Sequence, residues 1–178
     1  EIMAQKVTEG VDIRVMYDDL GSIGTYSVSD IIELTRMGIK CIPFNPFLFI
    51  KSQLNNRDHR KLMVIDGQIA YSGGVNLADE YINHVEKFGI WKDIGFRITG
   101  TGVKSYLYMF TEFWNAFSGD KLPRELFLEA PAQSIEDGYI LPYYDSPVKG
   151  EHTSNVLFTE LLSTVTDYIW FYTPYLML

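Results

Sequence analysis

The chain has 178 residues, of which 47% are hydrophobic and 15% aromatic, enough to bury the core of one domain, or of one domain and part of a second. This composition excludes an intrinsically disordered chain. The formal net charge of -8, from 15 Lys and Arg against 23 Asp and Glu, works against a broad grip on DNA or RNA phosphates, so no nucleic-acid partner is expected.

The first elements predicted along the chain are a strand, a helix and a second strand. Residues 11–19 alternate and are rich in β-branched side chains, which predicts a strand. Residues 27–38 then predict a helix capped by Ser27 or Ser29, and the apolar run 39–44 predicts another strand. This spacing is typical of a βαβ unit, whose parallel strands are covered by helices on both faces.

The same apolar run contains the single cysteine, Cys41, for which we expect a buried, unreactive thiol and a reducing compartment. No apolar run approaches the roughly 20 residues that a membrane-spanning helix needs, and no signal-peptide pattern opens the chain. These residues are therefore expected to be soluble. The chain opens on "EIMAQKV" and stops inside "YIWFYTPYLML", which predicts an excised piece of a longer protein.

The second half of the chain contains a long aromatic helix, predicted at 103–117, whose four aromatic residues recur at helical spacing. A core-facing stripe explains them better than a cofactor site does. They are Tyr106, Phe110, Phe113 and Phe117. Further predicted elements are a strand at 93–100, a linker at 119–137, a strand at 139–145, a helix at 153–167 and a strand at 168–176.

Residues 61–72, "KLMVIDGQIAYS", predict a β-hairpin that turns at Asp66 and Gly67. A two-residue type I′ turn needs positive φ at both central residues, and Asp before Gly meets that need. Such a turn would pair Lys61 with Ser72. For Asp66 alone, this structural role stands slightly ahead of a chemical one.

In this register His59 lies opposite Gly74 and shares a strand face with Lys61. A glycine at that position leaves open space beside the imidazole, and Asn76 lies within diagonal reach. Such a set suits a phosphoryl group, because an imidazole nitrogen can attack phosphorus while the ammonium and the amide hold its oxygens. Taken alone, His59 is also explained as an exposed residue at the edge of a strand. Neither turn chemistry nor packing, however, requires His59, Lys61, two glycines and Asn76 together, so the combination favours a functional site.

At these residues the chain resembles the phospholipase D superfamily, whose signature is His-x-Lys, four residues, Asp, six residues, Gly-Gly or Gly-Ser, one residue, and Asn. Within the superfamily it is most similar to bacterial cardiolipin synthases, through "VMYDDLGS", "GIKCIPFNP", "GGVNLADEYI" and "FGIWKDIGFRITG". The likeness covers about the first 118 residues and resumes in 168–176. The signature is complete here as His59, Lys61, Asp66, Gly73, Gly74 and Asn76.

The resemblance implies an α/β fold, a phospholipase D-like α-β-α sandwich with a mixed, largely parallel sheet flanked by helices and built from two repeats. Residues 1–118 would form the first repeat without its first strand, 119–137 a linker, and 138–178 a connecting strand and the truncated start of the second repeat. We hypothesise that 168–176 fills the vacant strand position, either within one chain or swapped between two copies in a homodimer.

The resemblance also implies a phosphatidyltransferase that converts two phosphatidylglycerol molecules to cardiolipin and glycerol through a phosphohistidine, without a metal or other cofactor. Asp93 matches the acidic residue that orients an imidazole in this family, although a strand-start cap explains it equally well. The candidate catalytic residues are His59, Lys61, Asp66 and Asp93, and the candidate phosphate-binding residues are Lys61, Gly74 and Asn76.

A second His-x-Lys motif, which in the family supplies the general acid, is absent from this sequence. His84 and His152 lack the companion lysine and are expected at the surface, and the three histidines lack the spacing of zinc ligands. The isolated chain is therefore expected to be inactive or weakly active unless a second copy supplies the proton donor.

Three function classes stay open: a phosphatidyltransferase, a phospholipase D-type phosphodiester hydrolase, and an inactive module that binds phosphate or a lipid headgroup. The expected partner is a phospholipid, at a membrane surface reached through the parent protein. The parent would lie at the bacterial cell membrane, with this portion on the cytoplasmic side. The apolar "NPFLFI" at 45–50 is either a lip for lipid entry or buried packing.

Overall fold

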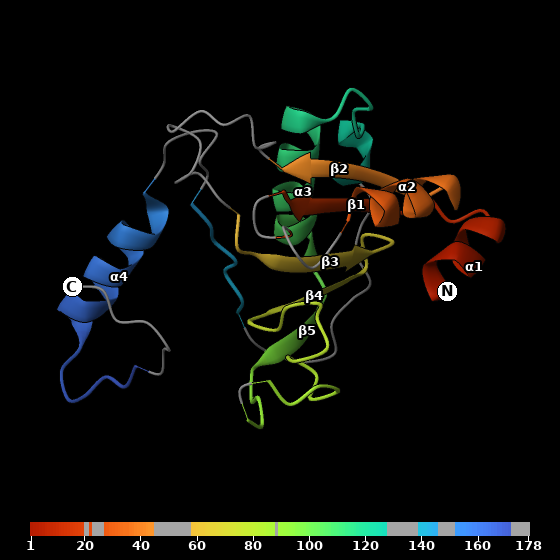
Figure 1. The fold of residues 1–178 in the computed structure, drawn as a ribbon. Coiled ribbons are helices and arrows are strands. Elements are labelled where there is room, and N and C mark those ends of the chain that lie inside the picture. The colour runs from red at the N-terminus through yellow and green to blue at the C-terminus, as the bar shows by residue number, and fades with distance from the viewer. Residues whose placement is uncertain are drawn as a thin grey trace, which may run out of the picture. The chain divides into compact units, whose positions relative to one another are not determined.

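The computed structural model describes residues 1–19, 22, 27–44, 58–87, 89–127, 139–145 and 152–171. The chain divides into two compact units, Glu1–Pro142 and Tyr143–Leu178. In chain order (Figure 1) the elements are α1 (Ile2–Thr8), β1 (Arg14–Asp18), α2 (Val28–Arg36), β2 (Lys40–Phe44), β3 (Lys61–Ile65), β4 (Ile69–Gly73), β5 (Gly95–Thr99), α3 (Val103–Phe117), the 3-10 helix η2 (Arg124–Phe127) and α4 (Thr153–Thr164).

The predicted βαβ unit is confirmed. Strands β1 and β2 pair in parallel along their whole length, and α2, which connects them, packs on β2. Ser27, of the two candidates, is the cap of α2: its hydroxyl accepts from the Asp30 N–H, while its own N–H donates to the Asp30 carboxylate at 2.8 Å. This capping box satisfies two backbone amides at the start of the helix. The helix ends just before Gly38, whose φ of 85° is a conformation that glycine adopts without strain.

The other sheet is antiparallel and has the order β3-β4-β5 in the described residues. The fold is therefore mixed α/β, as predicted, but only the β1–β2 pair is parallel among the described strand pairs, which differs from the expected largely parallel sheet. The reason is local: a tight turn can join only antiparallel neighbours, whereas parallel neighbours need a crossover connection.

The predicted hairpin of β3 and β4 is confirmed, but its predicted register is wrong by one residue. Lys61 pairs with Gly73, not with Ser72, so the connection holds three residues instead of two. Because side chains alternate along a strand, this shift changes which residues of β4 share a face with Lys61.

The turn itself has the predicted conformation. Asp66 and Gly67 adopt φ of 52° and 64°, and the Gln68 N–H donates to the Ile65 carbonyl at 2.9 Å. Gln68 is the extra residue, because it stands between the turn and the first residue of β4. Like a bulge, it shifts the pairing without disturbing the turn chemistry.

Helix α3 has the predicted bounds and forms the core of the first unit. It packs against β2, β3 and β4 and so joins the two sheets, and Figure 1 shows it behind β1 and β2. Of the predicted aromatic stripe, Tyr106 and Phe113 are buried, Phe110 is half-buried, and Phe117 is 38% exposed. The buried apolar residues of this core are Ile39, Phe44, Ala70, Ile98, Val103, Tyr106, Met109, Phe113 and Trp114.

Four charged side chains meet near the beginnings of β1 and β2. Arg14 lies 2.9 Å from both Asp12 and Asp120, and Lys40 lies 3.1 and 3.4 Å from the same two carboxylates. The Arg14 guanidinium also lies 5.1 Å from the ring centre of Trp114. The residues that follow α3 are in this way attached to the first sheet.

Some predicted elements differ from the structure. The described residues 139–145 form no strand, and Pro142 lacks the N–H that a sheet ladder requires. Of the strand predicted at 168–176, the described part, 168–171, is not a strand, and the rest lies outside the described residues, as does 45–50. Helix α1 was not predicted from the sequence, since it has no capping side chain and buries no residue.

Cys41 lies in β2 and is half-buried, and burial raises the pKa of its thiol, in agreement with the predicted low reactivity. Among the described helices, none combines the length and the apolar character needed to cross a membrane.

Candidate functional site

All the candidate site residues except Asp66 lie at one end of the antiparallel sheet, where β3 begins, β4 ends and β5 begins. Lys61 is the first residue of β3, Gly73 is the last of β4, and Gly95 is the first of β5, and Gly73 pairs with both of the others. The ladder thereby brings three segments that are distant in sequence to one edge. Around it lie His59 before β3, Gly74 and Asn76 after β4, and Asp93 before β5.

Neither glycine after the hairpin leaves room for a side chain. A Cβ at Gly73 would overlap the Ile94 carbonyl oxygen, and a Cβ at Gly74 would overlap the Asp93 carboxylate. The Gly74 N–H donates to the Ile94 carbonyl at 3.0 Å, which holds the two segments together. The open space predicted beside Gly74 for the imidazole is therefore occupied by Asp93 instead.

Asp93 is held at both carboxylate oxygens. Oδ1 accepts the Ile94 N–H at 2.7 Å, and Oδ2 accepts the indole N–H of Trp91 at 3.2 Å. The bond from the Ile94 N–H is the one expected of a cap at the start of a strand, which is one of the two explanations of Asp93 that the sequence allowed. The bond from Trp91 involves a residue that was not predicted from the sequence.

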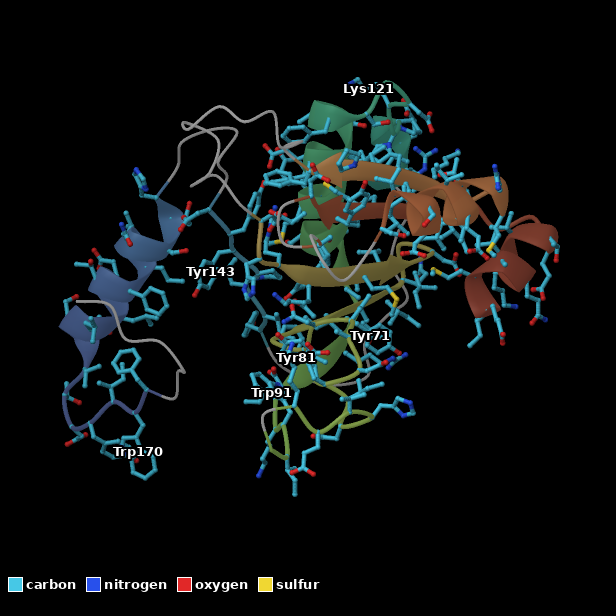
Figure 2. All side chains as sticks on the ribbon, viewed as in Figure 1. Tyr71, Tyr81, Trp91, Lys121, Tyr143 and Trp170 are labelled. Atoms are coloured by element: carbon cyan, nitrogen blue, oxygen red, sulfur yellow. The ribbon has the colours of Figure 1, made fainter. Side chains whose placement is uncertain are left out.

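Trp91 is itself fixed by its neighbours. The Asn83 side-chain amide accepts the Trp91 N–H at 2.6 Å and donates to the Trp91 carbonyl at 2.9 Å. The Trp91 ring meets Tyr81 edge to face, with 4.8 Å between ring centres and 83° between planes, and Figure 2 shows the two rings close together near β5. Asn83 has a φ of 59°, which asparagine tolerates better than most residues.

Lys61 is half-buried, and its ammonium donates to the backbone carbonyl of His59. Burial lowers the pKa of Lys61, while the carboxylates of Asp58 and Asp93 act in the opposite direction. Asp93 is therefore close enough to Lys61 to stabilise its positive charge. An ammonium in this setting is suited to compensate the charge of a phosphate.

The backbone around His59 is anchored on both sides. The Asp58 N–H donates to Asp18 at the end of β1, at 3.2 Å. The Arg60 guanidinium makes two bonds of 2.8 Å to the Asp58 carboxylate and lies 3.9 Å from the ring centre of Phe113 in α3. These contacts, which the sequence did not predict, attach the start of the motif to the first sheet and to the core.

The remaining motif residues differ in position. His59 is exposed, and among the described residues its imidazole makes no hydrogen bond or ion pair. Asn76 is half-buried beyond β4. Asp66 is exposed in the turn at the opposite end of the hairpin, so the structure does not bring it to Lys61. His84 and His152 are exposed, as predicted.

Exchanging Asp93 for asparagine is expected to lower the pKa of Lys61 further, because a carboxylate that raises it is lost while the burial that lowers it remains. The lysine would then lose its charge at a lower pH than in the native chain. NMR titration of the Lys61 Nζ resonance measures the shift. The matched control is Asp79→Asn, which removes an exposed carboxylate that is not among those raising the pKa of Lys61. An unchanged pKa in the Asp93→Asn chain would contradict the pairing.

Within the described residues, no cluster of three or more His, Cys, Asp or Glu side chains is arranged to hold a metal ion.

Comparison with known proteins extends these observations. No family model matches the chain. An uncharacterized protein of Streptococcus mutans serotype c is 40% identical over 99% of this chain and 39% of its own length. The cardiolipin synthase of Oceanobacillus iheyensis is 36% identical over 98% of this chain and 36% of its own length. The cardiolipin synthase of Halalkalibacterium halodurans is 31% identical over 98% of this chain and 35% of its own length.

The resemblance predicted from the motif is confirmed, and it extends over almost the whole chain instead of mainly the first 118 residues. The chain spans less than two fifths of the length of these relatives.

Proposed function

We propose that this chain, which is similar over 98% of its length to part of the bacterial cardiolipin synthases, carries the nucleophilic half of a phosphatidyltransferase site. The reaction would convert two phosphatidylglycerol molecules to cardiolipin and glycerol, with no metal or other cofactor. The observation that carries the proposal is the convergence of Lys61, the Gly73-Gly74 pair and Asp93 at one end of the antiparallel sheet, beside an exposed His59.

In the first half-reaction, an imidazole nitrogen of His59 attacks the phosphorus of one phosphatidylglycerol. A nitrogen–phosphorus bond forms, the bond from phosphorus to the glycerol oxygen breaks, and glycerol leaves with a proton from a general acid. In the second, a hydroxyl of another phosphatidylglycerol gives its proton to the same acid–base group, which lost one in the first step, and attacks the phosphorus, so that the nitrogen–phosphorus bond breaks and the imidazole is released. The covalent intermediate allows a lipid alcohol to take the place of water as acceptor.

The other residues receive roles that fit their positions. Lys61 compensates the charge on the phosphoryl oxygens, and Asn76 and the backbone at Gly74 bind them. Asp93 orients the imidazole once substrate is bound, since apo contacts of catalytic groups are often longer than those of the complex. Asp66 forms the turn that ends β3 and sets the length of the hairpin.

The general acid lies outside this motif, because neither His84 nor His152 is followed by a lysine two residues later. We propose that a second copy or a longer form of the protein supplies it. The first unit would then be part of a phospholipase D-like α-β-α sandwich that works at a membrane surface, where its phospholipid substrate lies.

The test uses the chain itself with phosphatidyl-p-nitrophenol in mixed micelles that contain phosphatidylglycerol. Since p-nitrophenolate leaves as a stable anion, the first step needs no proton donor. We expect a burst of p-nitrophenolate followed by formation of cardiolipin. Phosphatidic acid as the only lipid product would overturn the transferase assignment in favour of a hydrolase, and headgroup binding without any burst would overturn both in favour of a binding module.

A further inference from the structure

The segment between β4 and β5 is not held in place by burial of its apolar side chains. Leu77 is 99% exposed, Ile90 is 89% exposed, and Ile82 and Ile94 are 65% and 68% exposed. An exposed apolar segment of this kind would be free to move unless polar contacts fixed it. Its polar contacts include the Lys87–Glu80 ion pair, a backbone bond between Asp79 and His84, and a set of hydrogen bonds at Trp91.

Trp91 connects the middle of this segment to the residues just before β5. Its backbone N–H and carbonyl are both bonded to Asn83, and its ring rests against Tyr81. Its indole N–H, which can only donate, points in the other direction, to Asp93 Oδ2.

The Ile94 N–H bonds Oδ1 of Asp93, and the Trp91 indole bonds Oδ2, so both carboxylate oxygens are held. The absence of a side chain at Gly74 leaves the space that this carboxylate occupies. The oriented carboxylate then acts on the charge of Lys61. Groups that orient a catalytic side chain through a hydrogen bond have a large influence on activity even without touching substrate.

We propose that Trp91 is a positioning residue for the transfer reaction: held by Asn83, its indole N–H fixes the Asp93 carboxylate in the space beside Gly74. This inference rests on the proposed function for its catalytic meaning, but its structural content is independent of turnover.

The experiment compares the Trp91→Phe chain with the native one. Phenylalanine keeps an aromatic ring against Tyr81 but has no N–H donor, so Asp93 is expected to swing away and the pKa of Lys61 to fall in the same direction as in Asp93→Asn. The Lys61 Nζ titration followed by NMR measures this change. Trp170→Phe, at a tryptophan that is 87% exposed in the second unit, is the matched control and should change nothing.

A double variant makes the test sharper. In the chain that already carries Asp93→Asn, adding Trp91→Phe is expected to produce no further shift of Lys61, because the carboxylate through which Trp91 acts is gone. Equal shifts with and without Asp93, or no shift in Trp91→Phe, would overturn the inference. Since the titration requires no catalysis, an absence of phosphatidyl transfer would count against the proposed function alone.

Discussion

Replacement of His59 by alanine is expected to abolish the burst of p-nitrophenolate, because the variant has no imidazole to form the bond to phosphorus. Removing a group that forms a covalent intermediate leaves only the binding contributions of the remaining site, so the rate should fall by at least about a thousandfold. The burst phase in a rapid-mixing experiment measures it directly. Because His59 is exposed, the free energy of unfolding should change by no more than about 0.5 kcal/mol.

The matched control is His84→Ala, which removes another exposed histidine of the first unit that has no lysine two residues later. Its burst should equal that of the native chain. If His59→Ala keeps a burst of native size while binding phosphatidylglycerol micelles normally, the nucleophile must be another group.

Replacement of Trp114 by alanine is expected to be the most destabilising single change in the first unit. Trp114 is 1% exposed, its ring stacks on Phe110 with 5.8 Å between centres and lies under Arg14, and its indole donates to the Asp120 carbonyl at 2.6 Å. Truncating a fully buried aromatic residue costs about 3–5 kcal/mol through lost burial and the cavity that remains. Urea unfolding followed by far-UV circular dichroism gives the change.

Two further variants separate the causes of that loss. Trp114→Phe keeps a buried ring but removes the bond to Asp120, so it should cost about 1–3 kcal/mol. Trp170→Ala removes an exposed tryptophan and should leave the unfolding of the first unit unchanged. Equal midpoints for the native and Trp114→Ala chains would show that α3 does not anchor this core.

Elements with strong periodicity or strong turn chemistry could be predicted from the sequence. Helix α3 has the predicted bounds because its apolar residues recur at helical spacing. The sequence limited the cap of α2 to Ser27 or Ser29, and the structure selects Ser27 through its capping box with Asp30. The turn at Asp66 and Gly67 was also predicted. The register was not, since Gln68 has no propensity that distinguishes the last residue of a turn from the first of a strand.

The candidate site divides in the same way. Residues that the motif itself contains, such as Lys61 and Gly74, could be found in the sequence. Those that hold the site in place could not, because Trp91 contacts Asn83 and Asp93 within an irregular segment that has no periodicity, and Arg60 contacts Phe113, which is distant in sequence. A local pattern gives no information on which distant side chain a donor will meet. Asp93 had two equally good explanations in the sequence, a carboxylate that orients an imidazole and a strand-start cap. The bond from the Ile94 N–H agrees with the cap, and the side-chain donor at the other oxygen is the Trp91 indole and not an imidazole.

The two adjacent glycines of the motif allow folding defects to be separated from functional defects. At Gly73 the obstacle to any larger residue is the Ile94 backbone, which cannot withdraw without opening the pairing of β4 with β5. At Gly74 the obstacle is the end of a side chain, which can rotate away. Alanine at the first position would therefore damage the sheet, whereas alanine at the second would leave a well-folded protein whose acidic group points elsewhere. A mutational screen would meet both as loss of activity, although only one of the two variants would be lost from the soluble fraction.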